Sequence, residues 1–345
     1  MNVTICIGTL THPDSNHAIF ASEFRRRGDA VRMVALPSLT LVNGRLHGLA
    51  LDWPYAPPRT GGLTTGTARL VSLEDSDLCW VMNQPHPAMA ADVWQLLWNL
   101  GTRLPFVNDV AGLVFLNNKS NLPVVVPTEN LPETCVSSSE DFLSDTLACG
   151  EGSWIVKPTN GGAGNNVFLI EPGGANARAL LQSVTGSAAT QYELFTQEVV
   201  GMTERHAVLQ RYVPQARAEV QRVLVCHGEV IMNYGRCPSD ADHRSNYTHG
   251  GVLVPERPLT DEERQLAECV SRALLRFGIR FAGLDMAYPY VLELNLANPG
   301  GVVNSPTDAG GNEQARRVID LLLASLRGGQ GEPSGAGDRD TRELS

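Results

Sequence analysis

The first hundred residues alternate short apolar runs with amphipathic stretches. The apolar runs predict buried strands, and the stretches between them carry apolar residues at helical spacing. We expect strands at Val3–Ile7, Ala30–Leu36 and Leu78–Met82, and helices near Ser15–Arg27 and Pro87–Leu100. This order is typical of an open α/β sheet, which binds ligands at the carboxyl ends of its strands.

Two loops in this region have different expected roles. Gly8–Pro13 follows the first strand and is a candidate ligand loop, although His12 and His17 are more simply explained as polar residues at a helix start. Thr40–Thr67 is rich in Gly, Pro and Thr, which favours a loop or a short hairpin.

The rest of the chain contains four further predicted helices. Thr260 is a good N-cap residue, and three acidic residues follow it in the first turn. The predicted helices lie near Ser138–Ala148, Asn176–Ser183, Thr260–Phe277 and Glu313–Leu326. Gly328–Ser345 has almost no apolar residues, so we expect it to be disordered.

The most informative stretch is Phe281–Gly301, where two apolar runs flank a Tyr-Pro-Tyr turn. Val291–Leu296 reads as a strand with Leu292, Leu294 and Leu296 on one face and Glu293 and Asn295 on the other, roughly 7 Å apart. A hairpin would bring Asp285 beside them. Oxygen ligands of this kind suit Mg²⁺, which shares its coordination with phosphate. The alternative is an ordinary half-exposed hairpin with solvated acidic residues.

A second stretch, Gly152–Ile170, reads as strand, glycine-rich loop, strand. Lys157 ends the first strand, and Gly161, Gly162 and Gly164 lie in the loop. Glycines let backbone N–H groups approach phosphate oxygens, and a lysine in an apolar run calls for a partner. This is not a Walker A site, because no helix and no Gly-Lys-Ser/Thr follow. The alternative is a simple hairpin turn.

A third stretch carries arginines suited to phosphate or carboxylate. Val208–Pro214 and Val220–Cys226 read as strands, a turn leads into Val230–Met232, and the polar loop Cys237–Tyr247 follows. The candidates are Arg222, Arg236 and Arg244, each of which taken alone is more simply a surface residue.

In order and spacing, these segments resemble the ATP-grasp superfamily, and more closely prokaryotic glutathione synthetase and its relatives. The resemblance rests on Asn108-Asp109, Asn118-Lys119, Lys157-Pro158, Gly161–Gly164, Gln210-Arg211-Tyr212, Arg222-Val223-Leu224, Arg236-Cys237-Pro238, Arg244-Ser245-Asn246, Gly250-Gly251, Gly283-Leu284-Asp285 and Glu293-Leu294-Asn295. It implies an α/β (α+β) ATP-grasp fold. We expect an N-terminal domain at residues 1–127, a lid-like subdomain at 128–208, a catalytic subdomain at 209–327 and a tail at 328–345.

The resemblance also implies roles for individual residues. It places ATP on Lys119 and Lys157, under the lid glycines Gly161, Gly162 and Gly164, and against the hinge residues Gln210, Arg211, Tyr212 and Val213. It places Mg²⁺, with Mn²⁺ as a substitute, on Asp285, Glu293 and Asn295. It sets Arg222 near the reacting acyl phosphate, and Arg236, Arg244 and Asn246 in the loop that covers the substrate.

The implied activity is ATP-dependent ligation of a carboxylate to an amine through an acyl phosphate. Substrate positions depart from the family: Met82-Asn83-Gln84-Pro85 stands where glutathione synthetase has Arg-Lys-x-Pro, and Glu219-Val220-Gln221-Arg222 where it has Gly-Asp-Lys-Arg. We therefore expect an amino acid or small peptide substrate other than that of glutathione synthetase, for example in specialised metabolism. An ATP-binding scaffold without turnover, and a ligase acting on a peptide or protein terminus, remain open.

Composition narrows the partners. A net charge of −10 in 345 residues argues against a nucleic-acid surface or an anionic membrane surface. No run of 18 apolar residues suggests a membrane span, and no signal peptide is evident. Seven scattered cysteines fit reduced thiols in a cytoplasmic protein. The family resemblance implies small-molecule carboxylate and amine substrates as partners. By analogy with relatives, we expect a homo-oligomer, either a dimer or a tetramer.

Overall fold

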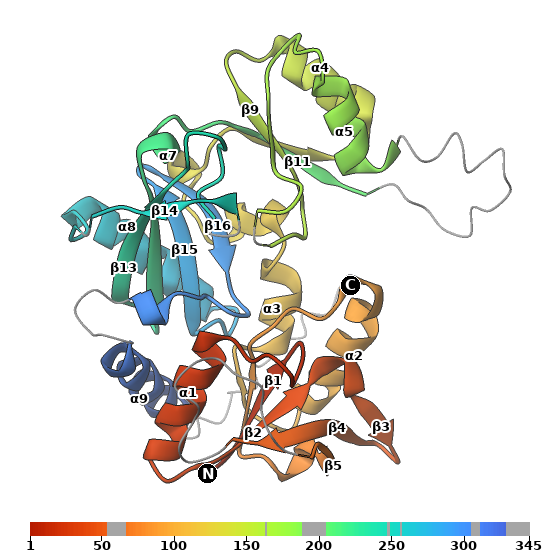
Figure 1. Cartoon of the computed structure of the whole chain (residues 1–345), viewed down its shortest axis with the longest axis vertical. Helices are drawn as coiled ribbons and strands as arrows, with labels where there is room; N and C mark the ends of the chain where they lie inside the picture. Colours follow the sequence, from red (N-terminus) through yellow and green to blue (C-terminus); the bar gives the residue numbers. More distant parts are fainter. Residues whose placement is uncertain are drawn as a thin grey trace, which may run out of the picture.

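The structure is a computed structural model that describes residues 1–53, 67–162, 164–187, 205–246, 249–255, 257–304 and 311–328. Within these residues the strands form three sheets, with the third sheet between the other two (Figure 1). Each sheet draws its strands from one continuous part of the chain. The fold class expected from the sequence is confirmed, while the domain boundaries stay a prediction.

The first sheet has a parallel centre and antiparallel edges. Its order is β3-β4-β2-β1-β6-β7, with β5 paired to β4. The strands are β1 (Asn2–Ile7), β2 (Ala30–Ala35), β3 (Thr40–Val42), β4 (Arg45–Asp52), β5 (Arg69–Ser72), β6 (Leu78–Val81) and β7 (Phe106–Val107). Helix α1 (Ser15–Arg26) packs Phe20 and Phe24 against Ile5 and Trp80, while α2 (Ala90–Gly101) packs on the other face. Alternate β1 residues thus face different helices.

The second sheet is antiparallel and has the order β10-β9-β11-β8. Its strands are β8 (Thr134–Ser137), β9 (Trp154–Pro158), β10 (Phe168–Ile170) and β11 (Ala207–Arg211). Helices α4 (Glu140–Cys149) and α5 (Ala177–Thr185) bury Trp154 and Val156 on one face. Because side chains alternate along a strand, Ile155 and Lys157 point to the opposite face.

The third sheet is antiparallel and has the order β14-β13-β12-β15-β16. Its strands are β12 (Val220–Cys226), β13 (Glu229–Cys237), β14 (Val252–Leu253), β15 (Phe281–Ala287) and β16 (Tyr290–Asn295). Helix α8 (Asp261–Leu275) covers one face, and α9 (Asn312–Gly328) packs against α1 and the other face. Short helices α3 (Val110–Leu116), η4 (Lys119–Val124) and α7 (Gln215–Ala218) connect the sheets.

Asn108 joins the end of β7 to the third sheet. Its Nδ2 donates to the carbonyls of Phe281 (2.7 Å) and Leu296 (2.9 Å), and its Oδ1 accepts from the N–H groups of Arg280 (2.8 Å) and Phe281 (2.9 Å). The side chain is 1% exposed, so these bonds are shielded from water. Asn108 therefore fixes the start of β15 and the end of β16 relative to the first sheet.

The predicted hairpin from Phe281 is confirmed, with one error. Asp285 pairs with Glu293, but the register shifts before Met286, which pairs with Val291. The shift leaves Leu292 as a bulged residue, so Val291 joins the core with Leu294 and Leu296. The prediction that Leu292 shares the face of Leu294 is wrong.

Most other predicted elements are confirmed to within two residues at their ends. Thr260 caps α8 through a capping box. Arg236, expected just after a strand, lies within β13. Thr40–Thr67 forms the β3–β4 hairpin as far as the structure describes it. Gly328–Ser345, apart from Gly328, lies outside the described residues, as do Ala163 of the glycine-rich loop and Tyr247 of the polar loop. None of the described helices is both long and apolar enough to span a membrane.

Candidate active site

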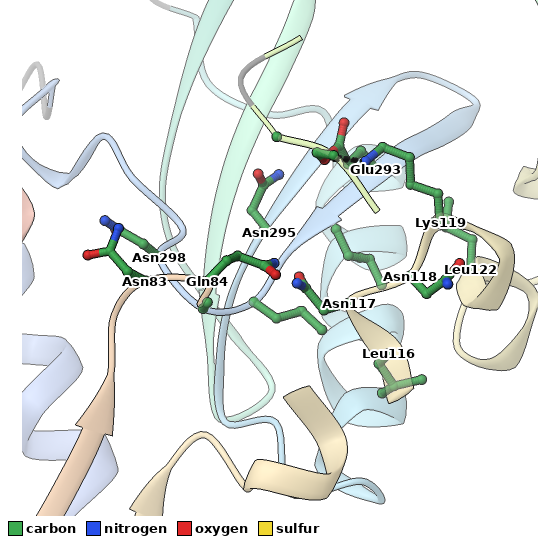
Figure 2. Close-up of a pocket in the computed structure, with 15 residues that line it drawn as sticks. Asn83, Gln84, Leu116, Asn117, Asn118, Lys119, Leu122, Glu293, Asn295 and Asn298 are labelled. Carbon is green, nitrogen blue, oxygen red and sulfur yellow. Dashed lines mark hydrogen bonds and ion pairs between the residues drawn. The ribbon is translucent and has the colours of Figure 1, made fainter. Parts of the chain in front are cut away.

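Two cavities meet at β16. The first, the hinge cavity, has a volume of ≈ 120 Å³ and lies between the second and third sheets; its lining includes Ile155, Lys157, Gly164, Gln210–Val213, Val220, Arg236, Arg244–Asn246, Asp285, Leu292 and Glu293. The second, the amide cavity, has a volume of ≈ 370 Å³ and is lined by Asn83, Gln84, Leu116–Lys119, Leu122, Gly161, Gly162 and Glu293–Asn298 (Figure 2). Glu293 lines both cavities, so it marks their junction.

Lys157 extends from β9 into the hinge cavity. Its Nζ donates to Gln210 Oε1 over 2.9 Å, and the residue is 6% exposed. Burial lowers the pKa of Lys157 to about 8, although the nearby Glu293 carboxylate opposes this shift. The lysine therefore remains mostly charged at neutral pH, with a neutral amide as its hydrogen-bond partner.

Lys119 reaches the same junction from the start of η4. Its Nζ lies 3.2 Å from Glu293 Oε1 and donates to the Gly161 carbonyl of the glycine-rich loop. The structure thus brings both predicted lysines to Glu293. They are also the only two lysines in the sequence, against 25 arginines, a compositional signal that the sequence interpretation overlooked.

Asp285 lies at the floor of the hinge cavity in a cluster of charges. Arg222 donates to both of its oxygens, over 2.6 Å and 3.1 Å, and Arg236 Nη2 donates to Oδ1 over 2.7 Å. Burial alone would raise the pKa of Asp285, but the two guanidinium groups outweigh it and hold that pKa below its usual value. The carboxylate is therefore ionised at neutral pH.

The predicted metal ligands also converge here. Register places Glu293 opposite Asp285 and Asn295 opposite Gly283, and Asn295 Nδ2 lies 3.5 Å from Asp285 Oδ2. Two carboxylates and one amide supply hard oxygen donors, which fits a divalent ion that shares its coordination with phosphate. Within the described ranges, no group of three His, Cys, Asp or Glu side chains forms a metal site of its own.

The loop after β13 closes over the glycine-rich loop. Arg244 Nη1 donates to the Gly164 carbonyl over 3.0 Å, and Asp242 holds the same guanidinium at 2.7 Å. A Cβ on Gly164 would lie 2.6 Å from Asn246 Oδ1, and its φ is +73°, so this position requires glycine. The sequence interpretation identified Arg244 and Asn246 but missed Asp242, because the partner is set by the loop conformation.

This closed loop limits the space beneath it. A cavity of ≈ 120 Å³ is smaller than the roughly 300 Å³ at which small-molecule sites begin. A nucleotide therefore requires the contact between Arg244 and Gly164 to open. Arg244 and Asn246 line the hinge cavity with Lys157, rather than the amide cavity.

The hinge residues Gln210–Val213 line the hinge cavity. Gln210 accepts a hydrogen bond from Lys157, and the Arg211 guanidinium lies 5.3 Å from the Trp154 ring centroid. Ile155, Val213, Val220 and Leu292 give the cavity apolar walls suited to a flat heterocycle. The bulge that misplaced Leu292 in the sequence prediction is what turns its side chain into the cavity.

The chain matches a known family over more than half of its length. Residues 121–308 match the family model "Prokaryotic glutathione synthetase, ATP-grasp domain". Glutathione synthetase of Gloeobacter violaceus is 27% identical over 285 residues, covering 80% of this chain and 82% of that protein. The enzyme of the same name from Rhodopseudomonas palustris is 27% identical over 313 residues, covering 90% and 93%.

A solved structure shows the same fold at low sequence identity. The crystal structure of the D-cycloserine synthetase DcsG superposes with a TM-score of 0.63 at 13% identity, covering 94% of this chain and all of that one.

Proposed function

This chain belongs to the prokaryotic glutathione synthetase ATP-grasp family, and we propose that it joins a carboxylate to an amine through an acyl phosphate. It is an ATP-grasp ligase of the ADP-forming, C–N bond-forming kind. The proposed substrates are an amino acid or small peptide and a small amine.

One observation carries the proposal: Glu293 lines both cavities, with both lysines and the Arg222–Asp285 cluster around it. A phosphate chain that enters from the hinge cavity would meet a carboxylate from the amide cavity at this junction. The side chains at the junction are those that phosphoryl transfer needs, namely cations for the phosphates and oxygen donors for a metal.

The first proposed step is transfer of the γ-phosphoryl group. A substrate carboxylate oxygen attacks the γ-phosphorus, the bond to the β-phosphate oxygen breaks, and ADP leaves. Lys119 and Lys157 neutralise phosphate charge during the transfer. The Lys119 ammonium has three N–H donors, and its contacts with Gly161 and Glu293 leave one of them for a phosphate oxygen.

The second proposed step forms the amide. The amine nitrogen attacks the acyl carbon, phosphate leaves with the C–O electron pair, and the amine proton is released. Arg236 lines the hinge cavity, and its Nε is buried with no hydrogen-bond partner among the described residues, so it would stabilise negative charge on the acyl oxygen. That donor is available to a substrate oxygen. Arg222 lines neither cavity and is bonded to Asp285 and the Pro299 carbonyl, so it would act by holding Asp285 in place.

The metal would be held by Asp285, Glu293 and Asn295, and when bound it would supply charge neutralisation at the phosphates. Mg²⁺ fits this set of oxygen donors, and Mn²⁺ is the alternative. Arg244 and the glycine-rich loop would exclude water, which would otherwise hydrolyse an acyl phosphate.

ADP release tests this function. The protein is incubated with Mg·ATP and a panel of amino acids and dipeptides, each paired with amines. ADP that depends on the substrate pair, with a product mass equal to both substrates minus water, supports the ligase. Tight ATP binding without ADP from any pair, including peptides with free carboxyl termini, would favour the scaffold.

A further inference from the structure

The wall of the amide cavity consists mainly of neutral, polar carboxamide side chains. Six of its side chains are carboxamides, contributed by Asn83, Gln84, Asn117, Asn118, Asn295 and Asn298. Its charged side chains are Lys119 and Glu293, which pair with each other at the end next to the hinge cavity. The rest of the lining is neutral, because Leu116, Leu122, Leu294 and Leu296 complete the wall beside the amides. Figure 2 shows Asn83, Gln84 and Asn298 on the side of the cavity away from the Lys119–Glu293 pair.

Some of these amides are already committed within the protein. Asn298 accepts from Asn16 Nδ2 over 2.9 Å and donates to Asp14 Oδ2 over 2.7 Å. Asn83 Oδ1 accepts from the Gly8 N–H over 3.1 Å, and Asn118 Oδ1 caps η4. These contacts hold the cavity wall in place.

Two of the amides are uncommitted. The side chains of Gln84 and Asn117 make no hydrogen bond to any other residue that the structure describes, and Figure 2 shows them directed into the cavity from opposite walls. The side-chain NH₂ groups of Asn83 and Asn118 are likewise without a partner in the described part of the chain. The cavity therefore offers several donors and acceptors and no free charge.

A neutral wall of this kind selects against ions. Gln84 is exposed and Asn117 is half-buried, so a ligand between them gives up part of its hydration rather than all of it. A carboxylate or ammonium that loses part of its hydration without a counter-ion still loses more solvation than hydrogen bonds to amides return. An amide ligand loses less, and it matches both the donors and the acceptors of a carboxamide wall.

We propose, resting on the proposed ligase function, that the substrate portion lying against Gln84 and Asn117 is an uncharged amide, either a side-chain carboxamide or a peptide bond. The reacting groups then all lie at the Glu293 end. Gln84 and Asn117 are specificity-determining residues that recognise the non-reacting part of the substrate.

Small probes test this without knowledge of the substrate. The ¹⁵N-labelled full chain is titrated with acetamide, acetate or methylammonium, and the side-chain NH₂ signals of Gln84 and Asn117 are assigned from Gln84→Leu and Asn117→Leu variants. We expect acetamide to shift both signals and the two ions to leave them in place. Shifts from either ion as large as those from acetamide, or none from acetamide, would overturn the proposal.

A charge placed in the cavity provides the converse test. Gln84→Arg should strengthen acetate binding at least tenfold, since a guanidinium supplies the missing counter-charge. Gln95→Arg places the same charge on the exposed face of α2 and should leave acetate binding as in the wild type. Equal acetate affinity in the two variants would contradict the assignment of Gln84 to the cavity wall.

Turnover separates this inference from the function on which it rests. In the ADP assay, asparagine and glutamine, free or as dipeptide residues, are compared with aspartate and glutamate. Amide members at least tenfold better than acids support the proposal. ADP release that is equal for acids and amides overturns it and leaves the ligase intact. Absence of ADP release with every substrate pair would count against the ligase, whereas the probe titrations would still decide the chemistry of the cavity.

Discussion

Replacing Lys157 with methionine should yield a protein that is more stable and inactive. The Lys157 ammonium is buried, and within the described residues its hydrogen-bond partner is the neutral Gln210 amide. Methionine fills a similar volume and carries no charge to desolvate. The substitution therefore removes an unfavourable term from folding and a cation from the proposed phosphate site.

The size of the effect follows from the pKa. Burial lowers the pKa of Lys157 from 10.5 to about 8. This shift means that folding disfavours the charged lysine by about 3 kcal/mol relative to the neutral one. Losing the bond to Gln210 costs about 1 kcal/mol. The variant should gain about 2 kcal/mol at pH 7. Between pH 8 and 10.5 the unfolded chain binds more protons at this lysine, so wild-type stability should rise through that window and the advantage of the variant should shrink.

Urea unfolding of both proteins at pH 7 and pH 10 measures this difference, and subtraction cancels the groups that the two proteins share. ATP should raise the unfolding midpoint of the wild type and not of Lys157→Met. The reasoning is refuted if the variant loses stability at pH 7, or if the gap between the proteins is the same at both pH values. Undiminished ATP binding by the variant would remove Lys157 from the phosphate site.

Three further substitutions test other parts of the site. Glu293→Gln should lower ADP release at least about 100-fold while the free energy of unfolding in urea changes by no more than about 2 kcal/mol, because the Glu293 side chain is 30% exposed although its partner Lys119 is 8% exposed; normal turnover would end the metal assignment. Arg244→Ala should raise the KM for ATP about tenfold and the KM of the carboxylate substrate less, since the contact that opens to admit a nucleotide would close again over it and slow its release. A larger effect on the KM of the carboxylate substrate in steady-state kinetics would instead assign Arg244 to substrate binding. Asn108→Leu should lower the free energy of unfolding in urea by about 3 kcal/mol or more, because it leaves buried backbone groups at β15 and β16 without hydrogen-bond partners. A loss below about 1 kcal/mol would show that water replaces those bonds.

Local patterns predicted most of the elements. Thr260 and Glu263 were sufficient to predict the start of α8, because a capping box depends on residues three apart. The hairpin of Asp285 and Glu293 followed from two apolar runs and a turn. The sequence order of the motifs then predicted that lysines, arginines and acidic residues would gather at one place.

What the sequence could not predict depends on contacts between distant segments. The bulge at Leu292 reverses one side chain, and no local pattern marks it. The Arg222 and Arg236 contacts to Asp285 depend on the register of β12 and β13. The amide cavity joins Gln84 to Asn117, which is 33 residues further along the chain, and to Asn298, which is 214 residues further, and these residues meet only when the sheets pack.

The scarcity of lysine makes this protein unusually simple to label. Apart from the chain's own α-amino group, an amine-directed reagent has two targets, Lys119 and Lys157, and both lie at the candidate site. With a pKa of about 8, roughly a tenth of Lys157 is unprotonated and nucleophilic at pH 7. Intact-mass spectrometry after limited acylation would therefore report site occupancy directly, and every bound nucleotide or inhibitor would register as the loss of one or two mass increments.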